Sequence, residues 1–329
     1  MRILITGGTG ALGKALVGRL AKDPLVEKIC ILSRDEHKVA AMSSLYVEPH
    51  PIRWFVGDIR DRDRMRVACQ GVDVVIHAAA LKRIDAVVNE SIELDKTNVA
   101  GTVNVLHAAM DAGVRKVLVV SSDKAVHPAN AYGTTKMLAE CHAVGFNSYS
   151  YPKGMAVSVV RYGNVAKSTG SIYHIWKKAI EEGKPLPLTH PEMTRFHITL
   201  PQAVEFCISS IQRTCGGEIF IPDLPAYRLV DLGKAMLLNA GREYIDGSFQ
   251  LVGLRPGGEK HSERMLSDEE PGRTLWQADR YVVMPSHRTW SSSKYYGLQL
   301  DVDPALDSSC QARWMTVNQL QEEFACTHL

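Results

Sequence analysis

The chain has 329 residues, of which 45% are hydrophobic and 22% are charged, and its formal net charge is +2. This composition belongs to a folded protein large enough for a main domain and a smaller lobe, and it excludes a disordered chain. The near-neutral charge indicates no nucleic-acid partner, and no run of about 18 apolar residues predicts a membrane span. Scattered cysteines and histidines, without CxxC or HExxH spacing, predict no metal site and indicate the reducing cytoplasm.

Strands alternate with helices over the first 165 residues. The predicted strands are Arg2–Thr6, Lys28–Ser33, Arg53–Val56, Asp73–His77, Lys116–Ser121 and Met155–Arg161. The predicted helices between them are Ala11–Ala21, Asp61–Cys69, Asp95–Ala112 and Tyr132–Phe146. Because the strands are apolar on both faces, this order favours an α/β fold with a doubly wound parallel sheet.

Regularity weakens after residue 165. Helices are predicted at Ile172–Gly183, Pro201–Arg213 and Asp231–Ala240, a short strand at Glu218–Ile221, and loops at Pro185–Pro191 and Pro256–Gly258. We therefore expect residues 1–165 to form the nucleotide-binding domain. Residues 166–329 should form a smaller, irregular substrate lobe, with some segments returning to the first domain.

A glycine-rich loop, TGGTGALG, spans Thr6–Gly13 between the first strand and the first helix. Its GxxGxxG spacing lets the backbone turn tightly and approach a pyrophosphate at the helix N-terminus, as in a Rossmann-type fold. We predict that this loop binds a dinucleotide through Gly7, Thr9, Gly10, Ala11, Leu12 and Gly13.

The end of the second strand distinguishes NADP from NAD. An acidic residue at this point would bind the ribose hydroxyls of NAD. The chain instead has Ser33 and Arg34, followed by Asp35. Because a guanidinium pairs with phosphate in a fork, Ser33 and Arg34 favour the 2′-phosphate of NADP, with NAD as the alternative.

Later strand ends add further cofactor contacts. Asp58 is predicted to accept a hydrogen bond from the adenine amino group, with a helix N-cap as the alternative role. Small residues after the fourth strand leave room for the cofactor, and Lys82 is predicted to contact cofactor or substrate phosphate. The predicted contacts from this region are Asp58, Ile59, Ala78, Ala79, Ala80, Lys82 and Asn98, and packing is the alternative role of Asn98.

A catalytic constellation follows the fifth strand, where Ser122, Asp123 and Lys124 precede Tyr132 and Lys136. The YxxxK spacing places Lys136 one helical turn beyond Tyr132, on the same face. An ammonium at that point lowers the pKa of the tyrosine, so its phenolate can act as a base. Ser122 is predicted to hold the reacting oxygen.

These motifs resemble the extended short-chain dehydrogenase/reductase family. More narrowly, the chain is similar to the inverting UDP-N-acetylglucosamine 4,6-dehydratases of the pseudaminic-acid type. The strings that carry the resemblance are TGGTGALG, ILSRDEHK, VGDIRDRDRM, HAAALKRID, KTNVAGTVNV, SSDKAVHPANAYGTTK, SVVRYGNV and MTRFHITL. Related hexose dehydratases carry Asp-Glu where this chain has Asp123-Lys124, and epimerases usually carry neither.

The resemblance implies NADP-dependent dehydration of a UDP-linked amino sugar by a homo-oligomer. Oxidation at C4 makes H5 acidic, a neutral Lys124 with a lowered pKa removes H5, and Asp123 protonates the departing 6-hydroxyl. A UDP-sugar 4-epimerase, a 5,6-dehydratase and a non-catalytic NADP sensor remain as alternatives.

Substrate contacts are expected from Lys82, Asn164, Arg195, Arg255 and Glu259, with the two arginines binding the diphosphate. Family members tend to show R-P-G-E-K-L-H-E, whereas this chain reads RPGGEKHSE over residues 255–263, with an additional glycine and no leucine.

Overall fold

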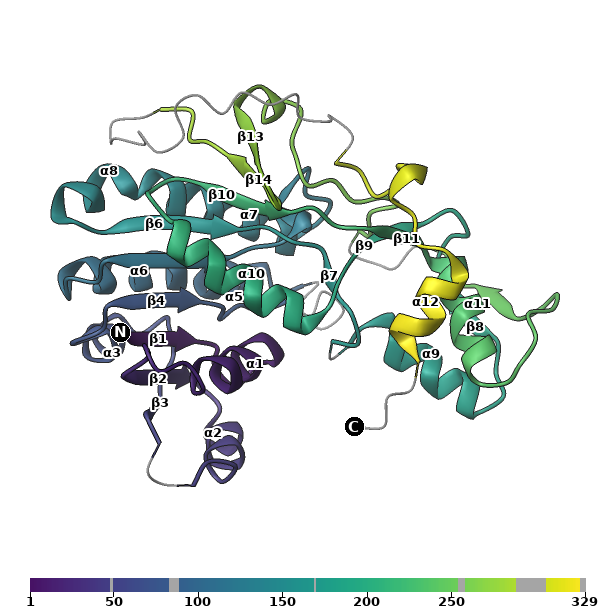
Figure 1. Cartoon of the computed structure of the whole chain (residues 1–329), viewed down its shortest axis with the longest axis horizontal. Helices are drawn as coiled ribbons and strands as arrows, with labels where there is room; N and C mark the ends of the chain where they lie inside the picture. The colour runs from purple at the N-terminus through teal and green to yellow at the C-terminus, as the bar shows by residue number, and fades with distance from the viewer. Residues whose placement is uncertain (48–49, 83–88, 169, 254–257, 288–305, 326–329) are drawn as a thin grey trace.

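The computed structural model describes residues 1–47, 50–82, 89–168, 170–253, 258–287 and 306–325 (Figure 1). A nine-stranded sheet of order β13-β14-β10-β6-β5-β4-β1-β2-β3 crosses the larger part of the molecule. Neighbouring strands from β3 through β10 are parallel, and β14 and β13 add an antiparallel edge. This topology confirms the predicted α/β class and the doubly wound sheet.

The predicted strands of this sheet form almost where expected. Their bounds are β1 Arg2–Thr6, β2 Lys28–Ser33, β3 Ile52–Val56, β4 Val74–His77, β5 Lys116–Val120, β6 Ala156–Val160 and β10 Ile219–Pro222. The hairpin strands β13 Thr274–Gln277 and β14 Arg280–Val283 were not predicted. The central strands are apolar and buried, and this burial of the sheet on both faces is what a parallel sheet between helices requires.

Helices cover both faces of the sheet. Their bounds are α1 Ala11–Leu20, α2 Glu36–Ser43, α3 Arg62–Cys69, α5 Ser91–Leu94, α6 Gly101–Asp111, α7 Ala131–Gly145, α8 Asn147–Ser150 and α10 Leu200–Arg213. The predicted helix Asp95–Ala112 differs from the structure, because a π-helical stretch, η1 Asp95–Ala100, precedes α6. Short 3-10 turns lie at η2 Asp123–Ala125 and η3 Tyr151–Lys153.

The smaller part has its own hydrophobic core, centred on Trp176, Leu186 and Leu232. It contains α9 Ile172–Glu181, α11 Leu229–Asn239 and α12 Val317–Phe324, which lie together in Figure 1. Short sheets join β7 Asn164–Val165, β9 Thr194–Ile198 and β11 Ala226–Arg228, and β8 Leu186–Leu188 with β12 Phe249–Leu251. The predicted loop Pro185–Pro191 is therefore wrong in part, because its apolar residues pair as β8.

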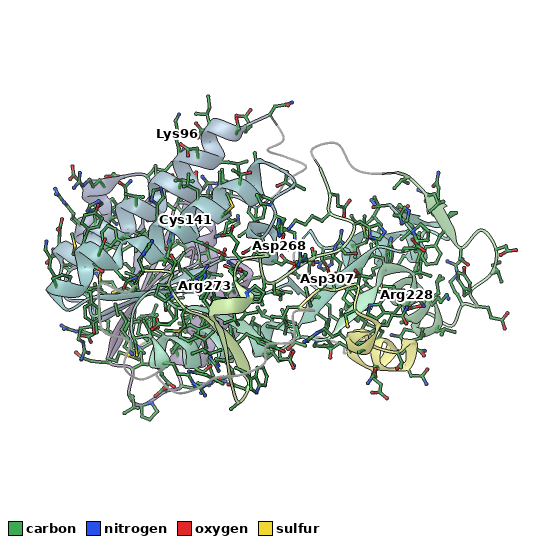
Figure 2. All side chains as sticks on the ribbon, turned by 90° about the horizontal axis from the view of Figure 1, so that it is seen from above. Lys96, Cys141, Arg228, Asp268, Arg273 and Asp307 are labelled. Carbon is green, nitrogen blue, oxygen red and sulfur yellow. The ribbon has the colours of Figure 1, made fainter. Side chains whose placement is uncertain are left out.

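The chain after residue 165 returns to the larger part several times. It contributes α10 and the strands β10, β13 and β14, with the 3-10 turn η4 Pro271–Arg273 directly before β13. Seen from above, Asp268 and Asp307 lie between the larger part, which carries Cys141, and the smaller part, which carries Arg228 (Figure 2). A last 3-10 turn, η6 Gln311–Arg313, precedes α12. None of the helices in the described ranges is both long and apolar enough to cross a membrane.

A buried ionic cluster joins helix α7 to this returning segment. The Arg161 guanidinium bonds Glu140 of α7 at 3.2 and 2.7 Å and Glu270 at 2.8 and 3.1 Å. It also donates to the Met265 carbonyl at 2.7 Å. Because all three charged side chains are almost wholly buried, the cluster holds its members in one arrangement.

Candidate active site

A cleft of about 1510 Å³ opens where the parallel strands end and the smaller part begins. Ligands of doubly wound folds bind at this edge of the sheet. The predicted residues that line the cleft are Gly7, Thr9, Gly10, Ala11, Leu12, Gly13, Ser33, Arg34, Asp58, Ile59, Ala78, Ala79, Ala80, Lys82, Ser122, Lys124, Tyr132, Lys136, Asn164, Arg195 and Glu259. Asn98 and Asp123 are not lining residues, and Arg255 lies outside the described residues.

The glycine loop has the geometry that a pyrophosphate requires. Gly7 has φ +69°, and a Cβ there would come within 2.8 Å of the Ala79 backbone. A Cβ on Gly13 would come within 2.5 Å of the Gly8 Cα. Gly10 caps α1 without a side-chain hydrogen bond, so no side chain occupies the N-terminal N–H groups of the helix. These groups fit an anion such as a dinucleotide phosphate.

At the predicted adenosine end of the cleft, the acidic side chain after β2 is paired with a lysine. Asp35 is turned into the N-terminus of α2, where it accepts from Lys38 N at 3.0 Å and pairs with Lys38 Nζ at 2.9 Å. Arg34 is exposed and lines the cleft, and Ser33 hydrogen-bonds Thr9 at 2.7 Å between the hydroxyls. The carboxylate that could have bound a ribose is thus engaged in capping, which favours a phosphate beside Arg34.

Asp58 faces the cleft but is held by a neighbouring cation. Its carboxylate accepts from Arg60 Nη2 at 2.8 Å and Nε at 3.0 Å. The N-cap of α3 is Asp61, which accepts from Arg64 N at 2.9 Å. Asp58 therefore does not cap that helix, and the alternative role given to it from the sequence is wrong.

Asn98 has a structural position. Its amide accepts from Leu81 N at 2.8 Å and donates to Leu81 O at 3.0 Å and Thr135 Oγ1 at 3.1 Å. These bonds join the buried amide to the segment after β4, as the alternative packing role expects, and a contact with cofactor stays a prediction. Lys82, on that segment, lines the cleft, and burial together with the Lys124 charge lowers its pKa.

Helix α7 presents Tyr132 and Lys136 on one face, as the spacing predicts. Asn130 caps this helix by accepting from Gly133 N at 2.9 Å. Lys136 Nζ donates to the Val120 carbonyl at 2.6 Å at the end of β5. Burial lowers the pKa of Lys136 to about 8.

The electrostatics around Tyr132 differ from the expectation. Burial raises the pKa of Tyr132, while the charge of Lys124 and a hydrogen bond with Ser122 oppose that rise. Lys124 is thus a second cation that favours the phenolate, beside the predicted Lys136, whose Nζ is bound to a backbone carbonyl.

Lys124 lies at the centre of a buried polar cluster. Its Nζ donates to Asp123 Oδ1 at 3.1 Å, Asn164 Oδ1 at 2.9 Å and Glu263 Oε1 at 3.0 Å. Ser122 Oγ also donates to Asp123 Oδ1, at 2.6 Å. Asp123 and Glu263 are 0% and 1% exposed, so the two carboxyls make hydrogen bonds within this cluster instead of with water.

The protonation states in this cluster correct two expectations. Asp123 and Glu263 raise the pKa of Lys124 above its usual value against the effect of burial, whereas a lowered pKa was expected. The Lys124 charge and hydrogen bonds from its neighbours lower the pKa of Asp123, again against burial. Burial and the Asp123 charge raise the pKa of Glu263 to about 7. Asp123 is thus the ionised carboxyl, and Glu263 is the one that holds a proton near neutral pH.

Arg195 closes the far side of the cleft. Its Nη2 donates to Glu259 Oε1 at 3.0 Å, and its Nε lies 3.5 Å from Glu263 Oε1. Its Nη1 donates to the carbonyls of Thr194 at 2.7 Å and His261 at 3.1 Å. A further Nη2 contact to Met193 Sδ at 3.1 Å engages the other N–H of that nitrogen, so the guanidinium is held by protein groups on every edge and brings positive charge to the cleft.

The segment 258–263 is tied to the start of α7. Asn130 Nδ2 donates to Gly258 O at 2.8 Å, and Lys260 Nζ donates to Asp123 O at 3.3 Å. Gly258 has φ +81°, and a Cβ there would come within 2.4 Å of Ala129 O. The additional glycine of the sequence therefore occupies a position that only glycine fits.

Sequence reasoning did not assign Glu263, Lys260 or Asn130 to the site. Glu263 ends the RPGGEKHSE string, and this was its only signal in the sequence. Its contacts with Lys124 and Asn164 span 139 and 99 residues, so no local spacing could reveal them.

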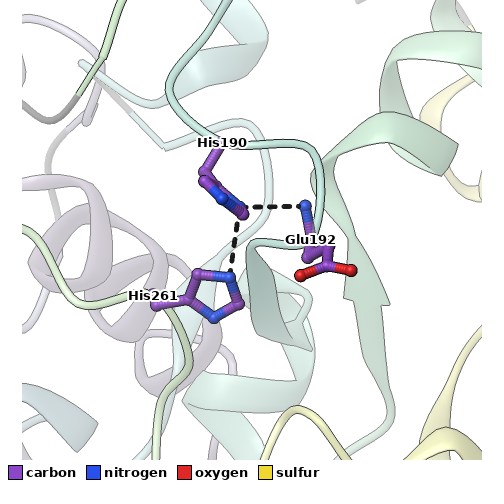
Figure 3. Close-up of side chains that lie close together, drawn as sticks. All are labelled: His190, Glu192 and His261. Atoms are coloured by element: carbon purple, nitrogen blue, oxygen red, sulfur yellow. Dashed lines mark hydrogen bonds between the residues drawn. The ribbon is translucent and has the colours of Figure 1, made fainter.

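Outside the cleft, His190, Glu192 and His261 form an exposed group on the outer side of the same segment (Figure 3). Among the described residues they are the one set of three whose potential metal-ligand atoms lie within 4.8 Å. His261 Nε2 lies 3.2 Å from His190 Nδ1, and the Glu192 backbone N–H also approaches His190 Nδ1 at 3.2 Å.

A glycine loop between β1 and α1 in a parallel sheet, with a Tyr-x-x-x-Lys helix against the same cleft, defines a short-chain dehydrogenase/reductase of the extended type. The model of the polysaccharide biosynthesis protein family matches residues 3–285, and the chain belongs to this family.

Individual relatives agree with this assignment. The chain is 41% identical over 285 residues to an inverting UDP-N-acetylglucosamine 4,6-dehydratase of Campylobacter jejuni, covering 86% of this chain and 83% of that protein. It is 36% identical over 299 residues to a UDP-glucose 4-epimerase of Rickettsia massiliae, covering 89% and 86%. The structure of Pen from Bacillus thuringiensis superposes with a TM-score of 0.82 and 31% identity, covering 87% of this chain and 89% of that one.

Proposed function

We propose that this protein is a UDP-sugar 4,6-dehydratase that converts UDP-N-acetylglucosamine with inversion at C5 and uses NADP. The observation that carries the proposal is the Asp123–Lys124 pair, held beside Tyr132 at the same cleft. Oxidation of a hydroxyl needs only the tyrosine, whereas loss of water also needs a base and an acid.

The residues of the cofactor half fit NADP. The glycine loop and the free N-terminus of α1 would hold the pyrophosphate, and Arg34 with Ser33 would hold the 2′-phosphate. When bound, this cofactor accepts a hydride at C4 of the sugar and later returns one at C6. We propose NADP over NAD because Asp35 caps α2 instead of facing a ribose.

Residues of this chain would carry out the proton transfers of the reaction. Tyr132 takes the proton of the 4-hydroxyl, and Ser122 orients the same oxygen. Once C4 is a ketone, H5 is acidic and Lys124 removes it. Since the carboxylates raise the pKa of Lys124, it must first lose its own proton. Glu263 in its ionised form can accept that proton along their 3.0 Å hydrogen bond, because a pKa of about 7 leaves part of the protein with this carboxyl ionised near neutral pH.

The substrate half would bind the nucleotide diphosphate. Arg195, Lys82 and Arg255 supply positive charge, and Asn164 and Glu259 supply polar contacts to the sugar nucleotide. We propose that the chain acts in the cytoplasm as a homo-oligomer, with residues 1–165 mainly holding cofactor and residues 166–329 mainly holding substrate. Sedimentation of the purified protein tests the oligomer.

One experiment separates this function from its main rival, a UDP-sugar 4-epimerase, which the 36% identical relatives favour. Purified protein is incubated with UDP-N-acetylglucosamine in heavy water, and the product is analysed by mass and proton NMR. We expect the loss of one water, a 4-keto-6-methyl sugar and deuterium at C5 with inverted configuration. A product of unchanged mass, inverted only at C4, would refute the proposal and indicate a 4-epimerase. A 5,6-unsaturated product would indicate a 5,6-dehydratase, and the absence of turnover would indicate a non-catalytic NADP-binding sensor. The Tyr132→Phe variant is the control.

A further inference from the structure

A carboxyl that was not assigned from the sequence reaches the cleft beside Lys124. Glu263 lines the cleft, although only 1% of it is exposed, whereas Asp123 is fully buried and does not line it. The two carboxyls meet at Lys124 Nζ, which donates to Asp123 Oδ1 at 3.1 Å and to Glu263 Oε1 at 3.0 Å, so two carboxyls share one ammonium.

We propose that Glu263, and not Asp123, is the catalytic acid that protonates the departing 6-hydroxyl. The inference rests on the proposed dehydratase function and assigns a role within it. Asp123 then has a positioning role, because its ionised carboxylate fixes Lys124 and Ser122 from behind.

The surroundings of Glu263 favour this division of roles. It meets charged or titratable groups from several elements, namely Asp123 and Lys124 of η2, Arg195 of β9, Tyr227 of β11 and, near it in its own segment, Lys260. Its backbone N–H is fixed by Ser308 Oγ at 2.8 Å, and its carboxyl accepts from Asn164 at 3.4 and 3.5 Å. A carboxyl held this firmly can deliver a proton to a fixed point.

The step balances in protons and electrons. The C5–H bond breaks, its proton goes to the neutral amine of Lys124, and its electron pair forms the C5–C6 double bond. The C6–O bond breaks as Glu263 gives its proton to the oxygen, which leaves as water. Lys124 is then an ammonium and Glu263 a carboxylate. Transfer of one proton along their 3.0 Å hydrogen bond restores both groups.

The leaving group tests the assignment. Fluoride departs with less need of a proton than hydroxide does, so UDP-N-acetyl-6-deoxy-6-fluoroglucosamine bypasses a missing acid. We expect Glu263→Gln to reduce water loss from UDP-N-acetylglucosamine by about 10²–10⁴-fold. The same variant should release fluoride from the analogue at nearly the wild-type rate. Glu218→Gln, which alters a buried carboxyl outside the cleft, is the matched control and should leave both rates unchanged.

Three results would overturn the proposal. They are an unchanged rate of water loss in E263Q, an equal loss of both reactions in E263Q, and the leaving-group-selective defect appearing in Asp123→Asn instead. If E263Q does not fold, Glu263→Asp carries the test, because it withdraws the carboxyl by one methylene and should slow only water loss. A wild-type protein that releases neither water nor fluoride would refute the proposed function itself, a result distinct from all of these.

Discussion

The buried cluster around Arg161 gives a prediction about stability. Arg161→Met removes a guanidinium that makes five hydrogen-bonding contacts of 2.7–3.2 Å, four of them to Glu140 and Glu270. The two carboxylates, whose side chains are 5% and 6% exposed, would remain buried without a cation. Removal of one partner of such a cluster costs about 3–5 kcal/mol, a large part of a typical stability of about 5–15 kcal/mol.

The assay is urea unfolding followed by tryptophan fluorescence and far-UV circular dichroism. Arg19→Met is the matched control, because Arg19 pairs with Glu205 at 2.6 Å on the surface and should contribute only about 0–1 kcal/mol. Arg161 lowers the pKa of Glu270 against the effect of burial, so without the guanidinium that pKa rises and folded R161M binds more protons than its unfolded chain. Its deficit should therefore shrink as the pH falls toward about 5. A loss in R161M no larger than in R19M, or a deficit independent of pH, would refute this reasoning.

Four further predictions concern the cleft. Protein purified without added nucleotide should release NADP(H) on denaturation, identified by mass, and Arg34→Ala should weaken binding of NADP far more than of NAD; release of NAD(H) alone would contradict the role of Arg34. Lys124→Ala should slow water loss by about 10²–10⁴-fold while borodeuteride still traps a 4-keto sugar, and near-normal dehydration would exclude Lys124 as the base. Gly258→Ala should raise the KM for the UDP-sugar, unlike Gly247→Ala, which has φ +87° but open space around its Cβ; equal effects would point to backbone strain alone. Folding raises the pKa of Glu263 to about 7, so protonated Glu263 stabilises the folded state. This stabilisation should be complete below about pH 4.3 and lost as the pH rises to about 7. The free energy of unfolding of E263Q, measured in urea, should not show this decrease with pH.

The sheet and the cofactor half could be predicted from the sequence because their signals are local. Apolar strands, the glycine spacing in Thr6–Gly13 and the Tyr132–Lys136 spacing each lie within a few residues. The bounds of β1 and β2 match the prediction residue for residue for the same reason.

The acid–base groups could be named from the sequence, but their protonation states could not. Whether Lys124 is an ammonium depends on Glu263, which lies 139 residues further along the chain. The hairpin β13–β14 escaped prediction because its short strands are defined by pairing with β10 rather than by their own pattern. The capping of α2 by Asp35 likewise could not be predicted from the end of the strand alone, because it depends on the start of the next helix.

The segment 258–263 meets the start of α7 through Asn130 and the substrate side through Arg195. Residues of this segment other than Gly258 and Glu263 can thus change with less effect on the cofactor half than on the substrate half. As such enzymes diverge, substitutions in this short segment can change which sugar is bound, while the tyrosine and the cofactor half that carry out oxidation stay the same.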